Sequence, residues 1–152
     1  AIVKRSLIFD QCSALLARLS VEIEAQSKLN LLALHIHSEN FYRDFLGILL
    51  GFKFRNTNKT NQNSQAIDLI DEKNKVVAQV SATATTAKIQ NSLRSLPGKY
   101  NGFRFKFISI SKDASALRKT KYTAPKGIIF DPKDDILDIA SLLRALNDLE
   151  IG

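Results

Sequence analysis

Apolar and polar positions follow two different periods along the chain, and these periods separate its helices from its strands. Near the N-terminus, apolar side chains recur at three- and four-residue steps and predict a long amphipathic helix over 2–28. A second helix is predicted to begin at Ser38, a favoured N-cap, and to end at Gly51, a favoured left-handed stop. Its expected buried face consists of Phe41, Phe45, Leu46, Leu49 and Leu50.

The middle of the chain has the two-residue period of strands. A short strand is expected over 52–54, before a wholly polar loop at 56–65. A β-hairpin is predicted next, because two β-branched runs, 66–71 and 76–82, flank a polar turn. The strand over 103–111 is the clearest, with Phe103, Phe105 and Phe107 alternating with Arg104, Lys106 and Ile108.

Helices and strands alternate in the second half as well. A helix is predicted over 85–96, with Thr85 as its N-cap, and a short helix mixed with loop is predicted over 111–126. A strand over 127–130 and a single amphipathic helix over 131–150 complete the chain. This order predicts an α/β fold with a mixed sheet flanked by helices. We expect one compact domain, with the N-terminal helix at 1–30 and the α/β core at 31–152.

Composition narrows the classes of protein. The 152 residues include one cysteine, Cys12, so an internal disulfide is excluded and a structural zinc site is not expected. The longest apolar runs are far shorter than a membrane span, and no signal-peptide pattern opens the chain, so we expect a cytoplasmic protein. Because the chain does not begin with methionine, we expect it to be one module of a longer protein. The N-terminal helix either packs on the domain or pairs with a second copy.

Positive charge is concentrated in one stretch of the sequence. Residues 99–133 carry nine basic and two acidic side chains, whereas the whole chain has a formal net charge of +7. Such a stretch favours binding to a nucleic-acid backbone, and a solvated surface is an equal alternative. The candidate cations are Arg104, Lys106, Lys112, Arg118, Lys119 and Lys121.

Candidate chemistry gathers on the predicted hairpin. Asp68 lies on its first strand, and Gln79 and Ser81, two residues apart on its second, share one face. A carboxylate and a second oxygen donor are the ligands that Mg²⁺ requires in metal-assisted phosphodiester cleavage. Glu39, from the second helix, is a candidate third ligand.

These motifs carry a resemblance to a known family. The segments HSENFYRDFL, AIDLID and VVAQVSATATTAKI, within residues 36–96, resemble the SMEK-type domain of bacterial conflict and antiphage defence proteins. More distantly, they resemble Mrr-like PD-(D/E)xK nucleases, which implies a restriction-endonuclease-like fold. That resemblance implies a Mg²⁺ site in which Glu39 matches the helix acid, Asp68 the strand acid and Gln79 the glutamine of a Q-x-K strand.

The chain departs from the nuclease pattern at Ser81, which stands where that family has a lysine that stabilises transition-state charge. Lys88, in the following helix, is the candidate replacement. The leading hypothesis is therefore a Mg²⁺-dependent nuclease-like domain of a defence protein. The alternative is an inactive module of the same fold that recognises nucleic acid, nucleotide or protein and regulates attached domains.

Each candidate residue also has a structural explanation. Asp68 would bond backbone N–H groups, Gln79 would be a structural amide, and Ser81 with residues 83–85 would cap the next helix. His35 and His37 have no evident third metal ligand, so packing or capping is preferred for them. The acids Asp131, Asp134 and Asp135 are expected to serve a helix N-terminus.

Overall fold

The computed structural model describes residues 42–43, 45–47, 51–56, 67–96, 98–110 and 112–151, with positions 10, 14, 17 and 21. Its elements are β1 (Arg55–Asn56), β2 (Leu69–Asp71), β3 (Val76–Ser81), α3 (Thr86–Arg94), η1 (Gly98–Tyr100), β4 (Arg104–Ser109), α4 (Ser115–Arg118), α5 (Pro132–Asp135), β5 (Ile136–Leu137) and α6 (Ile139–Ile151). No helix among these residues is long and apolar enough to cross a membrane.

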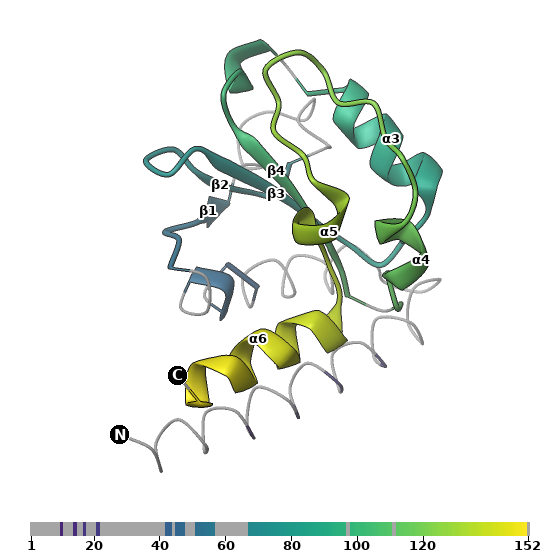
Figure 1. The fold of residues 1–152 in the computed structure, drawn as a ribbon. Coiled ribbons are helices and arrows are strands. Elements are labelled where there is room, and N and C mark those ends of the chain that lie inside the picture. The colour runs from purple at the N-terminus through teal and green to yellow at the C-terminus, as the bar shows by residue number, and fades with distance from the viewer. Residues whose placement is uncertain are drawn as a thin grey trace.

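The five strands of the described residues form one mixed sheet in the order β1-β2-β3-β4-β5. β1, β2 and β3 pair antiparallel, whereas β3, β4 and β5 pair parallel. The α/β class, the mixed sheet and the antiparallel hairpin are therefore confirmed. In Figure 1, α3 and α4 lie on one side of the sheet and α6 lies on the other.

Each face of the sheet has its own hydrophobic core. On the α6 face, Val80 of β3 and Ile108 of β4 pack with Leu142 of α6. On the α3 face, Val77 of β3 and Phe107 of β4 pack with Ile89 of α3. The two sets come from alternate positions of the same strands, as the two-residue period requires. The alternation predicted for 103–111 is confirmed.

Only part of the N-terminal third is described. Asp10, Ala14, Ala17 and Val21 are helical and exposed, and the rest of the predicted helix over 2–28 lies outside the described residues. In the second predicted helix, Phe45 and Leu46 are helical and buried as expected, and Tyr42 joins them in the core. Gly51 has a φ of 77°, as a left-handed stop requires.

Three predicted elements need correction. The strand expected at 52–54 is instead found at Arg55–Asn56, as β1. The Lys53 amide donates to the Asp71 carboxylate and not to a neighbouring strand. The strand expected at 127–130 contributes a single parallel bridge, between Ile129 and Arg104.

The largest correction concerns the helix expected over 131–150. The chain forms α5, then enters the sheet as β5, and begins α6 only at Ile139. Asp135 causes this break, because its fully buried carboxylate accepts hydrogen bonds from Arg104, Lys106 and the Asp131 amide. Asp131 does cap α5, with its side chain accepting from the Lys133 amide.

Candidate functional site

The hairpin brings Asp68 and Gln79 onto neighbouring strands. Leu69 pairs with Ala78, and the Asp68 amide donates to the Ala78 carbonyl at 2.9 Å. The half-buried Asp68 carboxylate then accepts a hydrogen bond from the Val80 amide, with 2.7 Å between Oδ2 and N. Asp68 therefore extends the β2–β3 pairing with its side chain, in the position where a strand carbonyl would otherwise stand.

Gln79 and Ser81 are both buried and both hydrogen-bonded. The Oε1 atom of Gln79, which is 3% exposed, accepts from the Ser92 hydroxyl of α3 at 2.6 Å. The Ser81 hydroxyl bonds the Thr83 carbonyl and accepts from the Thr83 amide, each at 3.0 Å. Gln79 thus ties β3 to α3, and Ser81 forms the turn at the end of β3. These contacts match the structural explanations for both residues.

The remaining predicted catalytic residues are placed as follows. Lys88 is half-buried in the first turn of α3, where its amide donates to the Thr85 hydroxyl, the predicted cap. Glu39, His35, His37 and Cys12 lie outside the described residues. Among the residues that the structure does describe, no three His, Cys, Asp or Glu side chains are grouped so as to hold a metal ion.

Asp71, at the end of β2, was not singled out from the sequence. Its buried carboxylate accepts from the amides of Lys53 and Asn74 and from the Asn74 side chain. Burial opposes the charge, but these hydrogen bonds outweigh it and lower the pKa of Asp71. Asp71 therefore stabilises the hairpin turn and its attachment to the segment before β1.

The six predicted nucleic-acid cations do not share one face. Arg104 and Lys106 alternate with the phenylalanines of β4 and so lie on the α6 face, where both pair with Asp135, at 2.7 and 3.0 Å. Arg118, Lys119 and Lys121 belong to α4 and the residues after it, which cover the opposite face. Lys112 is exposed on the loop between β4 and α4.

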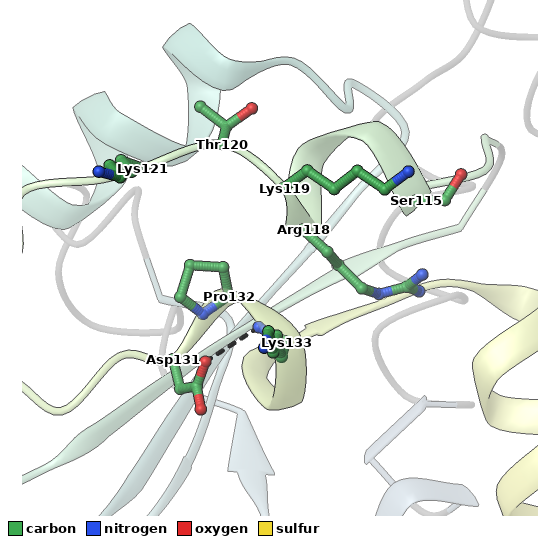
Figure 2. Close-up of a pocket in the computed structure, with 8 residues that line it drawn as sticks. All are labelled: Ser115, Arg118, Lys119, Thr120, Lys121, Asp131, Pro132 and Lys133. Carbon is green, nitrogen blue, oxygen red and sulfur yellow. Dashed lines mark hydrogen bonds between the residues drawn. The ribbon is translucent and has the colours of Figure 1, made fainter.

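A basic cleft lies between α4 and α5 (Figure 2). It has a volume of about 650 Å³, and it is lined by Ser115, Arg118, Lys119, Thr120, Lys121, Asp131, Pro132 and Lys133. Four of these side chains are cationic and one is acidic. The Asp131 carboxylate already accepts from the Lys133 amide, as the dashed line in Figure 2 shows. Lys133 belongs to the basic stretch 99–133 but is not among its six candidate cations, because the helix expected over 131–150 places it between acidic residues.

Arg118 is fixed at one end of the cleft. Its Nε donates to the Ile136 carbonyl at 2.9 Å, and its Nη2 lies 2.9 Å from the Asp138 carboxylate. Burial opposes the charge on Asp138, but the amides of Ala114 and Ser141 and the Arg118 charge outweigh it and lower the pKa of Asp138 to about 2. Asp138 is thus an ionised anchor that joins α4 to the start of α6.

The family model described as the SMEK domain matches residues 11–147, which is most of the chain. The chain belongs to the SMEK domain family. No curated protein and no solved structure matches it. The family match covers the hairpin, the sheet and both walls of the cleft, so all of these are parts of the SMEK domain.

Proposed function

We propose that this SMEK domain is a nucleic-acid-recognition module that binds the phosphate backbone through the cleft between α4 and α5. The observation that carries the proposal is the gathering of Lys119, Lys121 and Lys133 around one cleft, beside Arg118, which is paired with Asp138. When such cations neutralise phosphates, counterions condensed on the nucleic acid are released into solution. This release favours binding to any nucleotide sequence.

The hydrogen bonds of the hairpin support recognition in preference to cleavage. Asp68, Gln79 and Ser81 each direct a side-chain oxygen to a partner inside the fold, at distances between 2.6 and 3.0 Å. Oxygens used in this way hold the hairpin and α3 together. The same residues in a working nuclease would instead hold a metal ion or the attacking water.

The wider setting is also a proposal. The order of hairpin, helix and parallel strand, with its acid and Q-x-S pattern, supports a restriction-endonuclease-like fold that has lost its catalytic lysine at Ser81. We propose that such an inactive domain acts in the cytoplasm, as part of a bacterial antiphage defence protein, and regulates domains attached to it.

The test compares two double variants that remove the same charge. Lys119→Ala with Lys121→Ala removes two cations of the cleft, whereas Lys73→Ala with Arg94→Ala removes two exposed cations of the hairpin turn and α3. Fluorescence anisotropy with a labelled oligonucleotide measures the affinity of each. The first variant should bind the oligonucleotide about fivefold or more weakly, since each exposed cation contributes up to ~1 kcal/mol to the binding free energy. The affinity of the second variant should match that of the wild type. Equal losses of affinity in the two variants would show that binding depends on general surface charge and not on the cleft.

The second candidate is a Mg²⁺-dependent nuclease at the hairpin, and the observation that favours it is the juxtaposition of Asp68 and Gln79. In that case Asp68 and the Gln79 carbonyl, with Glu39, would bind the metal, and Lys88 would stabilise the developing charge. Calorimetric titration of Mg²⁺ and Mn²⁺ into the wild type and Asp68→Asn decides it. Metal binding that disappears in the variant supports the nuclease, and no binding to either protein removes this candidate.

A further inference from the structure

The cleft between α4 and α5 has cations on both of its walls. Lys119 is the C-cap of α4 and Lys121 follows it, whereas Lys133 comes from α5 on the other wall. Figure 2 shows Lys119 and Arg118 extending toward the Ser115 end of the cleft, with Lys121 at the opposite end. Positive charge is therefore distributed along the cleft and across it, and is not confined to one ridge.

Two buried carboxylates fix these walls in place. Asp138 accepts from the Ala114 amide, just before α4, and pairs with Arg118. Asp135 accepts from the Asp131 amide and pairs with Arg104 and Lys106 of β4. Each wall is thus tied to the sheet or to its neighbouring helix through an acid that is no more than 2% exposed. A cleft held in this way is preformed, which lowers the ordering cost of binding.

We infer that the cleft takes a single nucleic-acid strand in preference to a duplex. This inference rests on the proposed function and specifies its substrate. A duplex carries its phosphates on a wide convex surface, so we expect it to contact the rim of one wall only. A single strand can lie between the walls, where Lys119 and Lys133 contact its backbone from opposite sides. Single-strand binders combine a positively charged groove that follows the backbone with aromatic side chains that stack on the bases. The residues that line this cleft supply the positive groove and include no aromatic side chain.

The experiment measures affinities for a 12-nucleotide single strand, for the blunt duplex of the same sequence and for a nucleoside monophosphate, all at one ionic strength. Anisotropy follows the labelled strand and duplex, and competition follows the monophosphate. The single strand should bind roughly twofold to fivefold more tightly than the duplex, which is the contribution expected from Lys133, the one cation of the second wall. The monophosphate should compete only weakly, because it spans one part of the cleft.

Three single variants locate the effect. Lys119→Ala and Lys133→Ala, on opposite walls, should each weaken single-strand binding by roughly twofold to fivefold. Lys126→Ala removes an exposed cation that does not line the cleft and should leave the affinity unchanged. For the duplex, we expect only one of the two wall variants to matter.

The outcomes separate this inference from the proposed function. Duplex binding as tight as single-strand binding, still weakened by Lys119→Ala, would overturn the single-strand inference and leave nucleic-acid recognition standing. A monophosphate that competes as well as the strand would also overturn it, because the cleft would then hold one isolated phosphate. No binding of any of the three would overturn the proposed function and this inference together.

Discussion

The role of Asp68 separates a structural hairpin from a catalytic one, and two substitutions at this position distinguish the roles. Asp68 Oδ2 accepts from the amide of Val80, a residue only 6% exposed, at 2.7 Å. Asp68→Ala leaves that amide without this acceptor. A lost hydrogen bond of this kind costs about 1–3 kcal/mol. Asp68→Asn keeps a carbonyl oxygen in the same place, so we expect it to lower the free energy of unfolding by less than ~1 kcal/mol.

The assay is denaturation by urea, followed by circular dichroism at neutral pH, with thermal melting as a second measure. For a chain of this length, each ~1 kcal/mol corresponds to a shift of roughly 2–4 °C, so a cost of about 1–3 kcal/mol should lower the melting temperature of Asp68→Ala by about 2–12 °C relative to the wild type. Asp68→Asn should stay within a few degrees of it. Each measurement is repeated with Mg²⁺, which should not change this order.

Two results would refute the structural reasoning. If Asp68→Ala is as stable as the wild type, the contact with Val80 contributes nothing to the fold. If Mg²⁺ stabilises the wild type but neither variant, the carboxylate is a metal ligand, because only the charged side chain would then respond.

Three further predictions concern stability. The ionised Asp138 stabilises the fold fully above the unfolded pKa of ~3.9, and this contribution is lost as the pH falls through its folded pKa of about 2. In urea denaturation at several pH values, Asp138→Asn should be less stable than the wild type at pH 7. Between pH 4 and pH 2 the variant should lose less stability than the wild type does. Gly127→Ala should lower the free energy of unfolding by about 1–3 kcal/mol, because φ is 90° and a Cβ would lie 1.5 Å from Asn101 Oδ1. Gly98 has open space around it, so Gly98→Ala should leave the free energy of unfolding nearly unchanged. Ser92→Ala removes the donor to the buried Gln79 oxygen and should lower the melting temperature by roughly 2–8 °C, and an unchanged value would show that Gln79 has another adequate donor.

The elements predicted correctly are those whose pattern is local. The hairpin follows from β-branched runs around a polar turn, the alternation of β4 follows from its phenylalanines, and Thr85 follows from its place before an amphipathic stretch. Each of these signals lies within about ten residues. The mixed sheet then follows from the order of the elements.

The break at Asp135 could not be predicted in the same way. Its partners Arg104 and Lys106 lie 31 and 29 residues earlier in the sequence, so only the folded sheet brings them together. In the sequence, Asp135 fits a helix N-terminus as well as its acidic neighbours do. The helical spacing of apolar residues therefore predicted one unbroken helix over 131–150, although this segment contains β5.

The candidate sites show the same division. The shared face of Gln79 and Ser81 follows from their spacing, but the hydrogen bond from Ser92 depends on how α3 packs on the sheet. Arg118, Lys119 and Lys121 stood out as a basic run. Lys133 completes the cleft from the other wall, and no sequence signal joins it to them.

The most direct test of the account is chemical-shift mapping by NMR, which suits a protein of 17.0 kDa. Backbone amides are followed as an unlabelled single-stranded oligonucleotide is added to the isotope-labelled wild type. We expect the largest chemical-shift changes at 115–121 and 131–133, the two walls of the cleft, and little change in the hairpin at 67–81. Changes concentrated on the hairpin, or an unperturbed cleft, would contradict this expectation.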